Sequence, residues 1–592
     1  MSEARRSFFL RFGLAACGLM VSVPFLNPYH YYPLQTFYSE WLAFAIGLLA
    51  LAAVALAPSK NPIPVPAMCF GLIMLTLLLL LQVALGWVAY PLRSGLGSLY
   101  LIWAALLVML GAWLKGELGE ETVSRTLQWG LALAGTLAAA SGFVQYYRIA
   151  LPPGVYVTAV NQMFGTVNQV NNFADYLGCA LVSVAFLHAR GALRLWPALA
   201  CALPVAAGMA LSGSRGSWAY LGIVFVLVLL VRTGGRAHEA RRLLAVAVFS
   251  LAAFALIQIV NSSTEILAGP LGKPHSAGER LFDERSMGFG GAGRGQLLMY
   301  AWRMFDSAPV FGIGFGEFAW RAFELAADLP GGVPPGIDRH SHNLFTQLLA
   351  EGGIAALLCF AIPLGMWLWR MPWRSLSLER CWAIGVLAVI GFHSMVEFPL
   401  WHANFLGVFA LLLGVASPAN ALVEATRLRR GVIALIAAAG GLTAVGALSD
   451  YRAVERWYFA LEARGARGEN LGVDAVEDLL RFRETSLFGP YLERIASEVI
   501  VLDEHALADK LALNTQVMRA YPVPSVVLRQ VALLALSGRE SEAARVLRGA
   551  ARVYPDPVRQ WLPVLEQLSR DRPEIFSPLL ALARVELAKS AN

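Results

Sequence analysis

Two histidines stand one residue apart in the segment 338–343, directly before a long apolar run. Imidazole changes its charge near neutral pH, so a histidine there suits removal of a proton from a hydroxyl nucleophile. The pair could also ligate a metal or cap the following helix, but His-x-His supplies only two ligands, and Arg339 competes for the carboxylate of Asp338. The segment favours a general base or proton relay without a metal. Spacing alone leaves both His340 and His342 open as the essential histidine.

Arginines supply the complementary chemistry for an anionic substrate. Arg215 lies in the small-residue turn 212–217. The polar segment 261–343 adds further arginines, among them Arg280, Arg285 and Arg294. A guanidinium group matches two phosphate oxygens at once, so these residues could hold a diphosphate. Arg215 could equally extend toward the lipid headgroups as an interfacial residue.

An amide-rich segment offers hydrogen bonds to hydroxyl groups, as a sugar-binding surface must. Its amides include Asn168, Gln169 and Asn172, although such residues are also ordinary in turns. His30 lies in the aromatic segment 28–33. That segment could form an interfacial aromatic belt or contribute to the same site.

Helices in a membrane must position these residues. Of the 592 residues, 57% are hydrophobic and 15% are charged, whereas soluble domains carry about 25% charged residues. A helix crosses the hydrocarbon with roughly 20 apolar residues, and it satisfies its own backbone there. The sequence therefore predicts an all-α polytopic membrane protein with about 13 transmembrane helices. The predicted spans lie near residues 8–26, 41–57, 65–86, 98–114, 127–147, 173–188, 195–212, 217–231, 243–260, 344–369, 381–399, 402–417 and 431–449.

Positive charge sets the predicted orientation. When spans alternate from a cytoplasmic N-terminus, the inside loops hold most lysines and arginines, while the short outside loops hold Arg93, Arg148 and Arg215. This bias predicts a cytoplasmic N-terminus and a C-terminus on the other side. Both long polar regions, 261–343 and 450–592, would then lie outside the cytoplasm. The first is too long for a simple connector, and the second shows amphipathic helices that resemble tetratricopeptide-like (TPR-like) hairpins.

Four domains are predicted from these boundaries: an N-terminal bundle of about nine spans at 1–260, a large loop at 261–343, further spans at 344–449 and a helical domain at 450–592. The N-terminal apolar stretch is expected to be an uncleaved span, because no small-x-small cleavage site followed by a polar chain appears. The six cysteines lie in or beside apolar runs without CxxC spacing, so no disulfide framework or metal cluster is expected. The net charge of +7 resides largely in loop arginines, so nucleic acid is not an expected partner.

Several short motifs, in this order along the chain, resemble the O-antigen ligase superfamily. They are Ser214-Arg215-Gly216 after a span, Arg294 before Pro309-Val310-Phe311-Gly312-Ile313-Gly314, and His342-Asn343 before Leu348-Leu349-Ala350-Glu351-Gly352-Gly353. The aromatic segment 28–33, the amide segment 168–174 and the long C-terminal domain resemble its protein O-oligosaccharyltransferase branch, the PglL type. Gly353 is followed three residues later by Ala356, where the ligase pattern has Gly, Thr or Tyr. That departure weakens a lipopolysaccharide ligase more than a protein-glycosylating enzyme.

The resemblance implies an inverting glycosyltransferase of the bacterial inner membrane that works without a metal or other cofactor. It would move a preassembled glycan, in the periplasm, from undecaprenyl diphosphate to a Ser or Thr hydroxyl of an acceptor protein such as pilin. It implies that His342 is the essential histidine and that Arg215 and Arg294 hold the diphosphate. The remaining candidates would bind donor or acceptor: His30, Asn168, Gln169, Asn172, Arg280, Arg285 and His340.

Other functions fit parts of the same pattern. A lipid A–core O-antigen ligase or an O-antigen polymerase would share the donor and differ in the acceptor hydroxyl, and the C-terminal domain favours a protein acceptor. A transporter of lipid-linked sugars would be expected to have charged residues within its spans and two halves of similar sequence. Here the charged residues Asp175, Glu351 and Glu397 lie near span ends, and the sequence shows no internal repeat, so a transporter is the less expected function.

Overall fold

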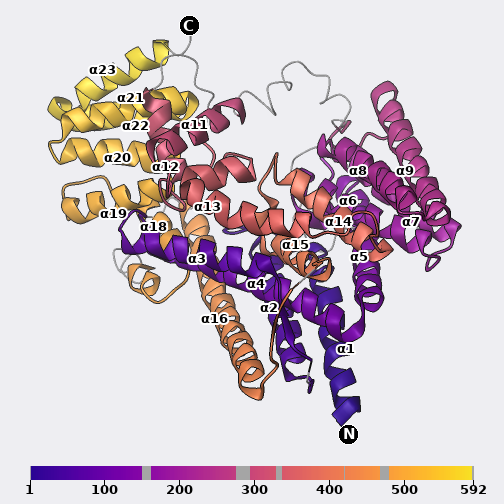
Figure 1. The fold of residues 1–592 in the computed structure, drawn as a ribbon. Coiled ribbons are helices and arrows are strands. Elements are labelled where there is room, and N and C mark those ends of the chain that lie inside the picture. The colour runs from indigo at the N-terminus through magenta and orange to yellow at the C-terminus, as the bar shows by residue number, and fades with distance from the viewer. Residues whose placement is uncertain are drawn as a thin grey trace. The chain divides into compact units, whose positions relative to one another are not determined.

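The computed structural model describes residues 2–59, 61–149, 162–274, 294–328, 337–418, 420–466, 479–499 and 501–589. The described chain is helical apart from one small antiparallel sheet, in which β1 (Ile63–Val65) pairs with β2 (Ala421–Val423) (Figure 1). Ile63 lies opposite Val423 in this sheet. The predicted all-α fold class is confirmed.

Long apolar helices make the chain a multi-pass membrane protein. Within the described residues, 10 helices are long and apolar enough to cross a membrane. Every predicted span falls on a helix, but three of these helices are shorter. They are α7 (Leu195–Leu211, 17 residues), α14 (Leu378–His393, 16 residues) and α15 (Ala403–Val415, 13 residues). The predicted number of spans therefore stays a prediction.

The chain folds into two compact units, the first formed by residues 1–75, 100–287 and 359–446. Besides α7, α14, α15 and the sheet, it contains α1 (Ser2–Met20), η1 (Val23–Phe25), α2 (Phe37–Leu56), α5 (Glu120–Tyr146), η2 (Gly165–Val167), α6 (Val170–Ala189), α8 (Gly216–Thr233), α9 (Ala237–Ser263) and η3 (Pro399–Trp401). Helix α6 is central, because it contacts α5, α7, α8, α9 and α14. A Cβ on Gly135 would lie 2.1 Å from that of Ala180, so a glycine lets α5 approach α6 closely.

The second unit is formed by residues 76–99, 288–358 and 447–592. It contains α11 (Arg294–Ser307), α12 (Phe318–Asp328), α18 (Gly489–Glu498), α19 (Leu507–Ala520), α20 (Pro524–Leu536), α21 (Glu540–Val553), α22 (Pro555–Asp571) and α23 (Pro573–Lys589). Figure 1 shows α19 to α23 stacked as successive layers. Four helices contribute residues to both units: α3 (Ala67–Ala84), α4 (Pro91–Leu118), α13 (Leu344–Trp369) and α16 (Arg427–Ala466).

One apolar core in the second unit joins the long loop to the C-terminal helices. Tyr300 of α11 and Phe323 of α12 are buried in the same cluster as Leu547, Leu565 and Phe576 of α21 to α23. Each of these helices turns one apolar face inward, which is the pattern of amphipathic helices in a solvated layer. The turn between α20 and α21 is made at Gly538, where φ is +73°. The segments 288–358 and 447–592 therefore fold together, and the TPR-like character stays a prediction.

Candidate active site

A carboxylate–imidazole pair lies in the second unit, directly before α13. Nε2 of His342 lies 2.7 Å from Oδ2 of Asp338, and the two side chains are 15% and 40% exposed. The other carboxylate oxygen, Oδ1, accepts the backbone N–H of Arg339 at 2.6 Å and that of His340 at 3.3 Å. Partial burial acts to raise the pKa of Asp338, but the hydrogen bond and charge of His342 outweigh it, so this pKa lies below its ordinary value. Asp338 is thus an ionised carboxylate that orients the His342 ring.

The backbone at His342 is held in an unusual conformation. Its φ is +56°, in the left-handed region that residues with a side chain rarely adopt. Both neighbours are fixed: Ser341 N–H donates to Oε1 of Gln347 at 2.7 Å, and Oδ1 of Asn343 accepts the N–H groups of Phe345 and Thr346, both at 3.1 Å. Asn343 therefore caps the N-terminus of α13. Such conformations persist where the surroundings enforce them, and they cluster at functional sites.

Helix α13 is interrupted ten residues beyond this cap, and another segment pairs with the break. Gly353 has φ +63° and ψ −164° inside the helix. The N–H of Ile313 donates to the carbonyl of Ala350 at 3.0 Å, and the N–H of Ile354 donates to the carbonyl of Pro309 at 2.8 Å. A Cβ on Gly312 would lie 2.2 Å from the carbonyl carbon of Glu351. The two glycine-rich motifs singled out in the sequence are therefore the two sides of one close backbone contact.

Two polar side chains clamp this contact. Gln82 Nε2 donates to the carbonyls of Phe311 and Glu351, both at 2.8 Å, and its Oε1 accepts the N–H of Phe315 at 3.0 Å. Oε1 of Glu351 accepts the N–H of Gly316 at 3.0 Å. These bonds fix the loop before α12 against α13, the helix that begins directly after the loop containing His342.

The other predicted arginines and histidines lie as follows. Arg215 is the half-buried residue directly before α8 in the first unit, after Gly213, whose φ is +71°. Arg294 is the first residue of α11 in the second unit. His340 is half-buried in the same loop as His342. Arg280 and Arg285 lie outside the described residues.

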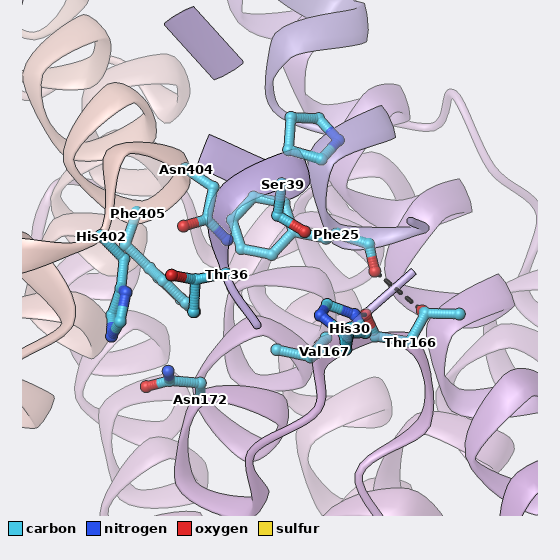
Figure 2. Close-up of a pocket in the computed structure, with 11 residues that line it drawn as sticks. Phe25, His30, Thr36, Ser39, Thr166, Val167, Asn172, His402, Asn404 and Phe405 are labelled. Carbon is cyan, nitrogen blue, oxygen red and sulfur yellow. Dashed lines mark hydrogen bonds between the residues drawn. The ribbon is translucent and has the colours of Figure 1, made fainter. Parts of the chain in front are cut away.

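The amide segment and His30 meet at a small polar pocket in the first unit (Figure 2). The pocket has a volume of about 20 Å³, which is room for about one water molecule. His30 and Asn172 line it, and the ring nitrogens of His30 lie 2.9 and 2.7 Å from the carbonyl oxygens of Gln35 and Thr166. Gln169 is the N-cap of α6 and accepts the N–H of Asn172 at 2.5 Å, while Asn168 is left-handed, with φ +60°. Gln169 and His30 thus hold local backbone together, and their part in substrate binding stays a prediction.

Sequence reasoning did not assign Asp338, Gln82 or Glu351 to the site. Arg339 interacts electrostatically with Asp338, as expected, and its guanidinium lies 4.8 Å from the ring centre of Tyr521. The spacing Asp338 to His342 was a usable signal for the pair. A glutamine in the apolar run of α3 was a usable signal for the clamp.

Comparisons with known proteins bear on the same residues. Residues 197–361 match the family model described as O-antigen ligase, and this range includes Arg215, Arg294 and His342. Residues 381–567 match a model described as the C-terminal part of a virulence factor membrane-bound polymerase. A general O-oligosaccharyltransferase of Acinetobacter baylyi is 23% identical over 414 residues, covering 68% of this chain and 69% of that protein. Residues 197–361 therefore match the O-antigen ligase family, and the chain is similar to a general O-oligosaccharyltransferase, which together support a membrane enzyme of the glycosyltransferase type.

Proposed function

We propose that this protein transfers a preassembled glycan from undecaprenyl diphosphate to Ser or Thr hydroxyls of acceptor proteins on the non-cytoplasmic face of the membrane. The observation that carries the proposal is the Asp338–His342 pair at the head of α13. An imidazole held by a carboxylate, partly exposed, and set in an enforced backbone conformation has the features of a general base.

The reaction follows from the orientation of the ring. If the N–H of Nε2 donates to Asp338, Nδ1 is the nitrogen that accepts the proton of the acceptor hydroxyl. The hydroxyl oxygen then attacks C1 of the first sugar, and the bond from C1 to the diphosphate oxygen breaks. The diphosphate leaves with the electron pair, and Asp338 stabilises the imidazolium that forms. Direct displacement of this kind inverts the anomeric configuration.

A diphosphate leaving group needs no proton if cations neutralise its developing charge. Arg215 and Arg294 are the arginines that the family resemblance assigns to this task. The C-terminal helices, which share their core with α11 and α12, provide the additional surface that a protein acceptor would need. The name of the Acinetobacter baylyi relative, general O-oligosaccharyltransferase, supports the transfer of an oligosaccharide to a hydroxyl oxygen.

The first test replaces the proposed base. His342→Ala should lower glycan transfer by roughly 10²- to 10⁴-fold, the usual contribution of a positioned general base. Transfer is measured with purified protein, lipid-linked glycan and an acceptor protein. His505→Ala is a matched control, because His505 is an exposed histidine of the same unit, and it should transfer normally. Undiminished transfer by the His342→Ala protein would refute the assignment.

A second test identifies the acceptor. Mass spectrometry of periplasmic proteins from a deletion strain should show loss of glycan, while lipopolysaccharide remains intact. Loss of O-antigen from lipopolysaccharide with protein glycans retained would instead identify an O-antigen ligase. Shortened glycans on both would identify a polymerase.

A further inference from the structure

A buried glutamine of the second unit holds the residue directly before His342. Gln347 is the fourth residue of α13 and is 2% exposed, and its neighbours in the sequence include the apolar Leu344 and Leu348. A buried amide costs free energy unless its polar atoms are bonded, so a glutamine at this position needs a partner. Its Oε1 accepts the backbone N–H of Ser341 at 2.7 Å, and Ser341 is itself 1% exposed.

The bond from Ser341 to Gln347 does not serve the end of the helix. Asn343 already accepts two of the N–H groups in the first turn of α13. The N–H of Ser341 lies two residues before this cap, outside the helix. Gln347 therefore fixes the backbone on one side of His342, while Asn343 fixes it on the other side.

The backbone of His342 needs to be fixed in this way. Its φ of +56° lies in the left-handed region, which costs free energy in a residue that has a Cβ atom. Such a conformation persists only where the surroundings enforce it. Release of Ser341 would let His342 return to a negative φ, and its Cβ would then point in another direction. The ring would thereby leave Oδ2 of Asp338, from which its Nε2 now lies 2.7 Å away.

The side chain of Gln347 is itself held by the contact between α13 and the loop before α12. Its amide interacts with the carboxyl of Glu351, which lies one turn further along α13 and is 6% exposed. Oε1 of Glu351 accepts the N–H groups of Gly316 at 3.0 Å and Phe318 at 3.4 Å. Arg93 interacts with the charge of the same carboxyl and donates to the carbonyl of Gly316 at 3.0 Å. The amide of Gln347 thus lies between a fixed carboxyl and the loop that carries the proposed base.

We infer that Gln347 is a positioning residue, which keeps His342 in its left-handed conformation, and its ring on Asp338, by holding Ser341. The inference rests on the proposed function, because it takes His342 to be the general base. Gln347 acts through the backbone and touches neither substrate nor reacting atoms in this arrangement. Its removal should therefore change the rate of the chemical step and leave substrate binding unchanged.

The test replaces Gln347 with methionine, which has a similar length but cannot accept the N–H of Ser341. In the full-length protein in detergent, Gln347→Met should lower kcat for glycan transfer roughly 10- to 100-fold, because a misplaced base loses its alignment. KM for the lipid-linked glycan and for the acceptor protein should each stay within about twofold of the wild type. A raised KM with an unchanged kcat would assign Gln347 to substrate binding and overturn the inference.

A second buried glutamine of the same unit separates positioning from a general loss of stability. Gln530 of α20 is 5% exposed, accepts from Nδ2 of Asn514 at 2.6 Å and donates to the hydroxyl of Thr515 at 2.8 Å. Gln530→Met also leaves hydrogen-bonding groups without their partner, so it should lower the melting temperature as Gln347→Met does. Its kcat, measured at a temperature where both variants are folded, should equal that of the wild type. An equal loss of kcat in both variants would reduce Gln347 to a structural role and overturn the inference.

A double substitution tests whether Gln347 acts through the ring of His342. Asp338→Asn and Gln347→Met should disturb the same orientation, so their effects should not multiply. The double variant should have about the kcat of the more impaired single variant. A kcat reduced by the product of the two single effects would show that Gln347 acts independently of the ring, which contradicts the inference.

Failure of this inference and failure of the proposed function are distinguishable. If His342→Ala abolishes transfer while Gln347→Met keeps the kcat of the wild type, the inference alone is wrong. If His342→Ala transfers normally, the proposed base is wrong, and the inference about its positioning is wrong with it.

Discussion

The described chain contains an aspartate–histidine pair in each of its two units, and the two pairs differ mainly in their access to solvent. In the second unit, His342 Nε2 lies 2.7 Å from Asp338, and in the first unit, His393 Nδ1 lies 2.8 Å from Asp175. The side chains of the first pair are 15% and 40% exposed, and those of the second are 1% and 0% exposed. The same hydrogen bond thus occurs once at a surface and once in a sealed interior.

The surroundings decide what each pair can do. A general base must reach the proton of a substrate, which His342 can do from its partly exposed loop. The Asp175–His393 pair joins α6 to α14 within a packed helical core, where a charge is tolerated only if it is paired. A surface pair contributes little to stability, whereas loss of one partner from a buried pair is costly. We therefore propose that the exposed pair serves catalysis, and we expect the sealed pair to stabilise the fold.

The largest effect on stability is expected from breaking the sealed pair. His393→Ala leaves Asp175 buried without its imidazole, which should cost about 3–5 kcal/mol. Thermal unfolding in detergent, followed by tryptophan fluorescence, should show a clear decrease in the melting temperature. His342→Ala, by contrast, should melt close to the wild type because its side chain meets solvent.

A double substitution checks the reason for this destabilisation. Asp175→Leu combined with His393→Leu removes both polar groups and should recover much of the stability that His393→Ala loses. If His393→Ala unfolds at the wild-type temperature, the sealed pair has no structural role and the comparison fails.

A smaller effect, on catalysis rather than stability, is expected from Asp338→Asn. The amide still occupies the site but does not stabilise the imidazolium, so kcat/KM should fall roughly 10- to 100-fold. Asp503→Asn is the control, because Asp503 is also a carboxylate of the second unit with a lowered pKa, held by Lys510, and it should leave kcat/KM unchanged.

The pH dependence of the Asp338→Asn effect has a defined sign. Partial burial raises the pKa of Asp338, but the hydrogen bond and charge of His342, the backbone N–H of Arg339 and the charge of His340 together lower it more, so the folded pKa lies below the ordinary value of 3.8. The contribution of the carboxylate is therefore complete above that value and is lost only as pH falls through the lower folded pKa. Between about pH 5 and 8 the ratio of wild-type to variant kcat/KM should be constant. A ratio that shrinks toward pH 5 would mean that Asp338 titrates in this range.

Local pattern was enough to predict most of the helices. Apolar runs such as 173–188 and 243–260 have the length and composition of a membrane span, from which helices were predicted. These runs lie within α6 and α9, as predicted. His342 was accessible to sequence reasoning for a similar reason, because a titratable residue at the edge of an apolar run is costly unless it has a use.

Contacts between distant segments were not accessible in this way. The run 344–369 was predicted as an uninterrupted span, because a Gly-Gly pair inside apolar residues is compatible with a helix. The break at Gly353 depends on the backbone carbonyls of Pro309 and Val310, which lie between α11 and α12, much earlier in the chain.

The smallest effect is expected at the cap beside the exposed pair. Asn343→Ala removes the oxygen that accepts two N–H groups of α13, and Ser377→Ala removes the corresponding cap of α14, where Ser377 accepts the N–H of Arg380. Each should lower stability by about 1 kcal/mol. Only Asn343 adjoins the left-handed His342, so only Asn343→Ala should also lower kcat, by a few-fold, as the ring loses its fixed orientation. Equal kcat in the two variants would show that the exposed pair is oriented by Asp338 alone, with no contribution from the helix cap.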